Sequence, residues 1–261
     1  MRALHIAATG MEAQQTRVEV ISNNLANMST TAYKPRRAEF ADLMYQQPRA
    51  AGTVNAADGS QLPSGVQLGL GVRLVSVTFD SIQGAIKATG NDLDLTIDGA
   101  GWFEVTLPNG EAAFTRDGTF KRTAEGVMVT SEGYALAPEI VIPEDAQRVT
   151  INPDGEVYAF FDNVVNPELL GVIPIVLFAN DKGLDPLGSN LYRETPASGP
   201  PAPGDAQTEN RGRILQGFVE ESAVDPVREI TELISAQRGY ELNSKVITAA
   251  DQMLASTTQI R

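Results

Sequence analysis

The chain of 261 residues contains no cysteine and a single histidine, His5. The absence of cysteine excludes disulfides and thiol chemistry, and it leaves the cellular compartment open. A histidine-based metal site or catalytic triad would need His5, which lies in a segment with helical periodicity, so we expect a surface or interface role for it. With no Ser/His/Asp or Cys/His arrangement available, the sequence predicts no enzyme activity, no catalytic residue, no cofactor and no metal site.

A long hydrophobic run is also missing. The longest apolar stretch, residues 172–179, is interrupted by Pro174. It is much shorter than the roughly 20 residues that a membrane-spanning helix needs, so we expect no membrane insertion. The first residues lack the continuous apolar centre of a cleaved signal peptide. We therefore expect a protein that stays in the cytosol or is exported without a cleaved signal.

Basic residues are few, with 20 Lys and Arg against 33 Asp and Glu and a net charge of -13. Because nucleic-acid binding is driven by basic surfaces, we expect no nucleic-acid partner. The acidity is concentrated in residues 80–209, which hold 21 acidic and seven basic side chains. Asp92, Asp94 and Asp98 resemble a carboxylate cluster, but they alternate with apolar residues, which predicts the solvated face of a strand rather than a metal site.

Both ends of the chain show the periodicity of long helices. Apolar residues recur seven apart near the N-terminus, with a second set between them, which is the pattern of a coiled-coil seam. Near the C-terminus, Pro226 follows Asp225, a combination that favours the start of a helix. The seam residues that we expect to mediate self-assembly are Leu4, Met11, Val18, Ile21 and Leu25 at one end, and Leu233, Tyr240, Ile247 and Leu254 at the other.

The middle of the chain has the alternating pattern of short strands. Asn109-Gly110 and Asp117-Gly118 are turn signals between such strands. The sequence predicts an α+β protein in which an antiparallel, coiled-coil-like pair of N- and C-terminal helices carries an inserted β-rich domain. The predicted segments are an N-terminal helix (1–30), an extended arm (31–71), a β-rich outer domain (72–210), a return linker (211–225) and a C-terminal helix (226–261).

Uncharged amides replace the usual charged residues on the faces of both helices. An unpaired charge is costly to bury, whereas an amide can form hydrogen bonds in a packed environment. These helices are therefore predicted to be surrounded by helices of other copies, although Asn27 could merely cap a helix end. The amides assigned to self-assembly are Asn23, Asn24, Asn27 and Asn243.

Three basic residues, Lys34, Arg36 and Arg37, follow the first helix. One interpretation is a solvated loop. The other is that these arm residues form ion pairs with carboxylates of a neighbouring chain.

Both ends of the chain resemble the bacterial flagellar rod and hook proteins, which form one axial family. The resemblance lies in "ISNNLANMSTTAYKPRRAEFADLMYQ" at the N-terminal end and "ESAVDPVREITELISAQRGYELNSKVITAADQML" at the C-terminal end. The middle segments "QLPSGVQLGLGV", "DLDLTIDGAGWFEVTLPNGEAAFTRDGTF" and "GLDPLGSNLYRET" extend it over essentially the whole chain. One departure is Ala32-Tyr33, where the family usually has Gly-Phe.

The resemblance implies a structural subunit of the distal part of the flagellar rod. Subunits of this family polymerise into a hollow helical tube whose inner layer is formed by the terminal helices. The expected partners are further copies of the chain, other rod proteins, the hook protein, the ring bushing in the peptidoglycan and outer membrane, and the export apparatus. The implied location is the periplasm-spanning rod of the basal body, and the arm at residues 45–71 would stiffen it.

Two alternatives remain at the level of sequence. The chain could be a hook protein or a proximal rod protein of the same family, although the hook protein is generally larger and the arm favours the rod. A cell-wall-acting enzyme with a β domain is a distant second, because no pair of carboxylates stands out.

Overall fold

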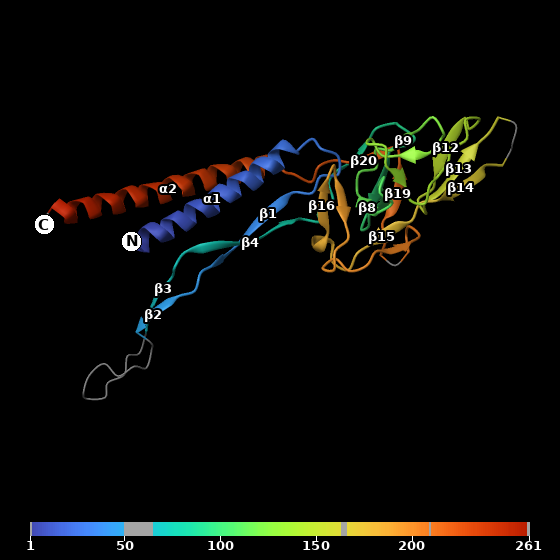
Figure 1. The fold of residues 1–261 in the computed structure, drawn as a ribbon. Coiled ribbons are helices and arrows are strands. Elements are labelled where there is room, and N and C mark those ends of the chain that lie inside the picture. The colour runs from blue at the N-terminus through green and yellow to red at the C-terminus, as the bar shows by residue number, and fades with distance from the viewer. Residues whose placement is uncertain (1, 50–64, 163–165, 209, 260–261) are drawn as a thin grey trace. The chain divides into compact units, whose positions relative to one another are not determined.

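The computed structural model describes residues 2–49, 65–162, 166–208 and 210–259 (Figure 1). The chain divides into two compact units. The helical unit comprises residues 1–26, 36–79 and 225–261, and the β-rich unit comprises residues 27–35 and 80–224.

Two long helices dominate the helical unit, α1 (Arg2–Ala26) and α2 (Pro226–Gln259). They lie side by side, with the two ends of the chain at the same end of the pair, so the helices are antiparallel (Figure 1). The start of α2 confirms the prediction, because the Asp225 carboxylate caps the helix by accepting hydrogen bonds from the Val227 and Arg228 backbone N–H groups. Neither helix has, among the described residues, an apolar stretch long enough to span a bilayer.

A two-stranded ribbon lies against α1. Its strands β1 (Arg36–Asp42) and β4 (Val72–Phe79) are antiparallel. A shorter pair, β2 (Gln46–Arg49) and β3 (Val66–Leu68), continues from it. The predicted arm thus begins as a β-ribbon, and its residues 50–64 lie outside the described residues.

The β-rich unit is built from short antiparallel strands. Its largest sheet has seven strands in the order β16-β17-β8-β7-β11-β10-β9. The remaining strands form the three-stranded sheet β12-β13-β14 and the pairs β15-β18, β19-β6 and β20-β5. The bounds are β5 (Ile86–Ala88), β6 (Leu95–Asp98), β7 (Phe103–Thr106), β8 (Ala112–Thr115), β9 (Lys121–Arg122), β10 (Met128–Val129), β11 (Ala135–Leu136), β12 (Arg148–Ile151), β13 (Glu156–Phe160), β14 (Glu168–Val172), β15 (Ile175–Leu177), η1 (Asp181–Gly183), β16 (Asp185–Gly188), β17 (Leu191–Arg193), β18 (Ala202–Gly204), β19 (Arg213–Gln216) and β20 (Phe218–Glu220).

The two predicted turns have different outcomes. Asn109-Gly110 connects the paired strands β7 and β8, and Gly110 has the positive φ of 82° that favours glycine there. Asp117-Gly118 does not form a hairpin, because β8 and β9 are not neighbours in the sheet. A Cβ atom on Gly118 would overlap the Leu95 carbonyl oxygen, so this glycine permits a close approach of two backbones.

One hydrophobic core fills the centre of the β-rich unit. Phe103 and Phe120 meet edge to face with their ring centroids 5.4 Å apart. They pack among aliphatic side chains that come from both early and late strands. These include Leu95, Ile97, Met128, Leu136, Ile140, Ile142, Ile151, Val157, Ile173, Ile175 and Ile214.

The structure differs from the predicted segments at both edges of the β domain. The domain was expected to begin at residue 72, but β4 pairs with β1 in the helical unit, and the β-rich unit resumes at Asp80. Residues 211–225 were expected to be a linker, yet they contain β19 and β20, and Ile214 is buried in the core. These strands are integral because they pair with β6 and β5.

Candidate assembly site

The contact between α1 and α2 depends on small residues. Gly10 of α1 lies against the Asn243 side chain of α2, where an added Cβ would come within 2.9 Å of the amide nitrogen. Gly239 of α2 lies in the same way against the Gln14 side chain, with a corresponding distance of 3.1 Å. The glycines therefore let the helices approach where large amides project, which explains a glycine in the middle of a helix.

The residues through which α1 and α2 contact each other differ from the predicted seam residues by about one position, since Gly10 and Gly239 make contacts next to the predicted Met11 and Tyr240. Ile21 is buried, whereas Leu4, Met11, Val18, Leu25, Leu233 and Ile247 are half-buried, and Tyr240 and Leu254 are exposed. The residues that face the partner helix in α2 include Ala236 and Asn243, which are seven apart. An ion pair between Arg17 and Glu232, 3.3 Å apart, adds a polar contact along the same face. Assembly roles for the predicted seam residues stay a prediction.

Asn24 is buried where α1 meets both α2 and the ribbon. Its amide nitrogen donates to the Arg36 carbonyl at 2.8 Å and to the Glu229 carboxylate at 3.2 Å, and its oxygen accepts from the Arg36 N–H at 2.8 Å. Burial raises the pKa of Glu229, and the hydrogen bond from Asn24 partly offsets that shift. An amide suits this position because it both donates to and accepts from one backbone residue. Asn24 thus connects segments of its own chain, and any contact with another copy stays a prediction.

Replacing Asn24 with leucine should lower the free energy of unfolding of the helical unit by about 2–4 kcal/mol, because buried polar groups of Arg36 lose their partners. A matched control is Ser22→Leu at an exposed position, which should change stability by less than about 0.5 kcal/mol. Urea unfolding followed by helical circular dichroism measures both variants. Equal stability of the two variants would contradict the assigned role.

The other N-terminal amides differ from Asn24. Asn23 is exposed on α1. Asn27 lies in the turn after the helix, where its side-chain oxygen accepts a hydrogen bond from the Thr30 hydroxyl at 3.1 Å and its carbonyl accepts one from the Thr30 N–H. Asn27 therefore stabilises the end of the helix, which matches the simpler of the two sequence interpretations.

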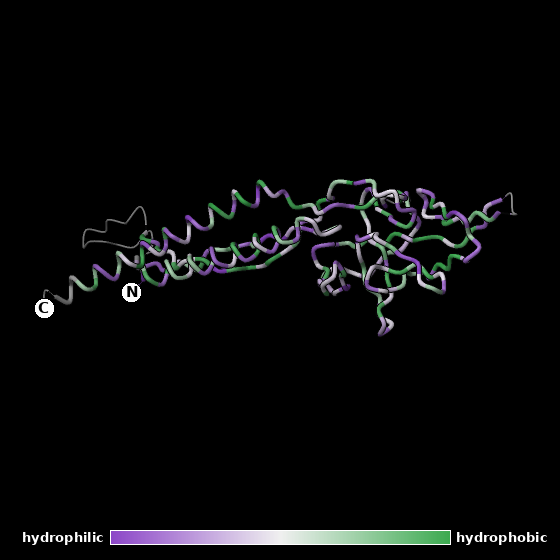
Figure 2. Tube along the Cα trace, turned by 90° about the horizontal axis from the view of Figure 1, so that it is seen from above, coloured by the Kyte–Doolittle hydropathy of each residue, from purple (hydrophilic) through white to green (hydrophobic). Residues whose placement is uncertain are grey.

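A row of apolar side chains covers the side of α2 that faces away from α1. We call it the outer face, and it consists of Val227, Ile230, Ile234 and Leu242. Val227 is 75% exposed and Leu242 is 62% exposed. Figure 2 shows hydrophobic residues at intervals along α2, and the exposure of those in the outer face means that α2 has apolar side chains outside its contact with α1. Extended exposed apolar surface of this kind is typical of an interaction site. The sequence interpretation missed this face because it assigned one seam to each helix.

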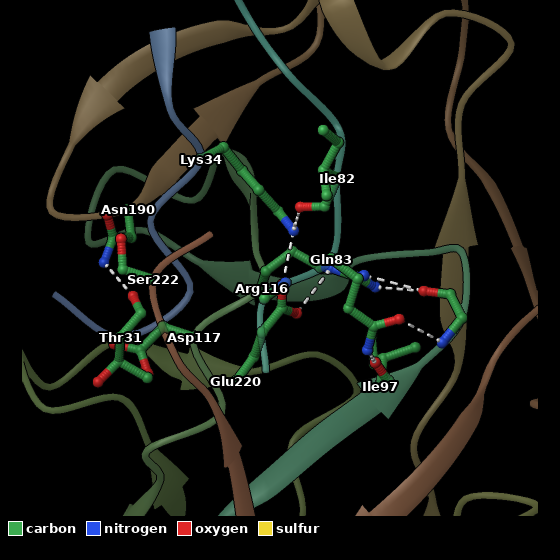
Figure 3. Close-up of polar contacts among 12 residues, drawn as sticks. Thr31, Lys34, Ile82, Gln83, Ile97, Arg116, Asp117, Asn190, Glu220 and Ser222 are labelled. Atoms are coloured by element: carbon green, nitrogen blue, oxygen red, sulfur yellow. Dashed lines mark hydrogen bonds and ion pairs between the residues drawn. The ribbon is translucent and has the colours of Figure 1, made fainter. Parts of the chain in front are cut away.

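Lys34 lies in a buried charge cluster of the β-rich unit (Figure 3). Its ammonium group donates to Glu220 at 2.6 Å and to the Ile82 carbonyl at 2.8 Å. The Arg116 guanidinium is 3.4 Å from the second oxygen of Glu220 and donates to the Gly99 and Gly101 carbonyls. Lys34 is therefore neither in a solvated loop nor available to a neighbouring chain, which corrects both sequence interpretations.

The cluster is electrostatically costly because two buried cations, Lys34 and Arg116, share one directly paired carboxylate, Glu220, although the Asp181 carboxylate also attracts both. Burial lowers the pKa of Lys34 more than the attraction of Glu220 raises it, and Arg116 lowers it further. Burial also lowers the pKa of Arg116. Glu220 is consequently the group on which both cations depend.

Arg36 and Arg37 belong to the helical unit, at the start of β1. Arg36 is half-buried and its backbone is held by Asn24. Arg37 is exposed, and its charge lowers the pKa of Glu229 slightly against the effect of burial. Contacts of these two residues with another chain stay a prediction.

The three spaced aspartates do not converge. Asp94 is buried rather than solvated, and its carboxylate accepts hydrogen bonds from the side chains of Thr89 and Asn91. Asp98 forms an ion pair with Arg213 at 2.8 Å, and Asp92 is exposed. Asp94 and Asp98 are therefore each engaged in their own local structure, and Asp92 lies on the surface as the sequence predicts for all three.

Three family models match different parts of the chain. "Flagella basal body rod protein" matches residues 4–34, "Flagellar hook protein FlgE/F/G D1 domain" matches residues 96–159, and "Flagellar basal body rod FlgEFG protein C-terminal" matches residues 215–260. A relative from Agrobacterium fabrum, "Flagellar basal-body rod protein FlgG", is 49% identical over 97% of both chains. The chain belongs to the flagellar basal-body rod protein family.

Other relatives with the same description extend over similar lengths. The FlgG protein of Caulobacter vibrioides is 47% identical over 100% of both chains, and that of Borreliella burgdorferi is 41% identical over 100% of this chain and 99% of its own. Membership in this family makes the chain a structural component of the flagellar basal body rather than an enzyme. Neither the cell-wall-acting enzyme nor the hook protein is favoured by these similarities.

Proposed function

We propose that the chain is a subunit of the distal flagellar rod that polymerises into a rigid, hollow helical shaft. The observation that carries this proposal is the exposed apolar outer face of α2, on a helix whose opposite side already packs on α1. A helix with apolar residues on several sides is stable in water only when further partners cover it. In a tube of identical subunits, other copies would supply them.

In this proposal α1 and α2 form a coiled-coil-like inner layer around a channel through which exported proteins pass. Residues 20–26 at the end of α1 carry no charged side chain and include the exposed Ser22 and Asn23, so a passing unfolded chain would find few charges to bind there. The β-rich unit would form the outer layer, where its acidic surface would face the ring bushing. The shaft would connect proximal rod proteins to the hook and transmit torque across the periplasm.

Export is proposed to occur through the flagellar apparatus without a cleaved signal. The chain contains no cysteine, so refolding after export would need no disulfide formation. The ribbon of β1 and β4 and the arm that continues from it would stiffen the contact between copies.

Electron microscopy of the purified full-length chain over a range of concentrations tests the proposal. We expect straight tubular assemblies above a threshold concentration, because association through many weak contacts is cooperative. A chain that stays monomeric at every concentration, in low and high salt, would contradict self-assembly.

A further inference from the structure

The outer face of α2 carries two cations within its apolar row. Arg238 and Lys245 are exposed and follow Ile234 at the spacing of helix turns. Among the described residues, the ion pairs of α2 involve Arg228 and Glu232 rather than these two cations. The outer face therefore combines aliphatic contact area with two positive charges that are available to a partner.

The side of α1 that faces solvent has the opposite charge. Its acidic residues are Glu12 and Glu19, both exposed. Glu19 accepts a hydrogen bond from the neighbouring Gln15 amide at 3.1 Å. The only ion pair that the described part of α1 forms with α2 uses Arg17 instead. The two carboxylates are thus also available to a partner.

The spacing of the two charge pairs is the same. Glu12 and Glu19 are seven residues apart, as are Arg238 and Lys245. Seven residues of helix correspond to two turns and about 10.5 Å along the axis. Two helices lying side by side can therefore bring both cations against both carboxylates in one register.

A groove borders this acidic side of α1. It is lined by Gln15, Val18 and Glu19 from α1 and by Gln237, Tyr240 and Glu241 from α2, and its volume is about 370 Å³. Tyr240, predicted as a seam residue, thus lines a groove that is open to solvent. The groove can accommodate an aliphatic side chain of a helix that lies along it.

We infer that the outer face of α2 in one copy docks along the Glu12–Glu19 side of α1 in the next copy, with Ile234 and Leu242 seated at the groove. Arg238 and Lys245 pair with the two carboxylates. This inference rests on the proposed self-assembly and specifies its contact. Because two different surfaces of the chain meet, the contact is heterologous, and repeating it joins many copies into a ring or an open helical polymer rather than a two-fold symmetric dimer.

The occupant is a second copy because one chain presents both complementary surfaces. Within one chain they cannot meet, since the outer face points away from the α1 that the opposite side of α2 contacts. Charge complementarity of this kind selects partner and register more than it adds affinity.

The test uses two charge-reversed forms of the full-length chain. The first carries Arg238→Glu and Lys245→Glu, and the second carries Glu12→Lys and Glu19→Lys. Alone, each form would bring like charges together, so its threshold concentration for assembly should rise at least about tenfold. In an equal mixture each form complements the other, and the threshold should return to within about threefold of the native value. Sedimentation and electron microscopy at low salt measure the threshold.

A matched control carries Lys121→Glu and Arg122→Glu, two exposed positions on β9 of the β-rich unit, and should assemble like the native chain. If the native chain assembles and either reversed form assembles equally well, or if the mixture stays as impaired as its components, the docking contact is overturned while self-assembly stands. If the native chain itself does not assemble, the proposed function fails instead.

Discussion

Replacing Glu220 with glutamine should lower the free energy of unfolding of the β-rich unit by about 3–5 kcal/mol, the usual cost of removing one partner of a buried ion pair. Glutamine keeps the shape and the hydrogen-bond acceptor, so the change removes mainly the charge. Lys34 and Arg116 would then be two buried cations without a carboxylate between them. Urea unfolding followed by the fluorescence of Trp102, the one tryptophan of the chain, reports on this unit.

The control for this prediction is Lys34→Met. It leaves Arg116 paired with Glu220 and removes one of the two cations, so its cost should be smaller, about 1–3 kcal/mol, from the lost hydrogen bond to the Ile82 carbonyl. A Lys34→Met variant that is less stable than Glu220→Gln would contradict the assignment of Glu220 as the central group.

The lowered pKa of Lys34 adds a pH dependence with a definite sign. Its ordinary value is 10.5, and burial lowers it in the folded chain. As the pH rises toward 10.5, the folded chain releases this proton before the unfolded chain does, so the contribution of Lys34 to stability increases with pH. In Glu220→Gln the carboxylate no longer raises the pKa of Lys34, so this pKa falls further in the folded chain. The increase of stability with pH should therefore begin at a lower pH in this variant.

The second large effect concerns assembly. Ile230→Asp combined with Ile234→Asp should abolish polymerisation, because each isoleucine would contribute about 1.5–3 kcal/mol by burial, and each aspartate would place a carboxylate in an apolar contact. The threshold concentration should rise at least about a hundredfold. Both positions are exposed within the chain, at 45% and 46%, so the monomer should fold normally. Light scattering measures the assembly.

The matched control is Leu169→Asp on β14 of the β-rich unit, where the native side chain is 49% exposed. It should leave the threshold unchanged within about threefold. Equal loss of assembly in the control would show a general effect of added charge. Normal assembly of the isoleucine variant would exclude the outer face as a contact.

The element types at both ends and in the middle could be predicted from local sequence, because helix periodicity, a capping aspartate and Asn-Gly turns are local signals. Strand pairing could not, since it depends on contacts between distant segments. Residues 211–225 resemble a linker in sequence, yet Ile214 completes a core whose other members, apart from Ala206, lie between β6 and β15.

The candidate site was predicted only in part. The heptad spacing of apolar residues predicts two paired helices. In the structure the closest contacts are made by Gly10 and Gly239, about one position away from the predicted seam residues. A search for apolar periodicity cannot find such contacts, because each one places a glycine against a polar amide side chain. Lys34 was misjudged because its partner Glu220 is distant in sequence. Nothing near Lys34 in the sequence signals that it is buried.

Ala32 occupies a position where the family usually has glycine, and the structure shows how the backbone accommodates alanine there. Its φ is 56°, in the left-handed region where glycine carries no steric penalty, and the family pattern has glycine there. Its N–H donates to the Glu220 carbonyl at 2.8 Å, which holds the turn in this conformation. The turn is thus retained despite the substitution.

The central claim is that another copy covers the outer face of α2 when the chain assembles. Because the native chain contains no cysteine, Ile234→Cys and, as a reference, Leu169→Cys each introduce a single labelling site. The rate of thiol labelling of each variant is compared between monomer and assembled material. The account predicts at least about tenfold protection of position 234 upon assembly and little change at position 169. Equal labelling of position 234 in both states would contradict it.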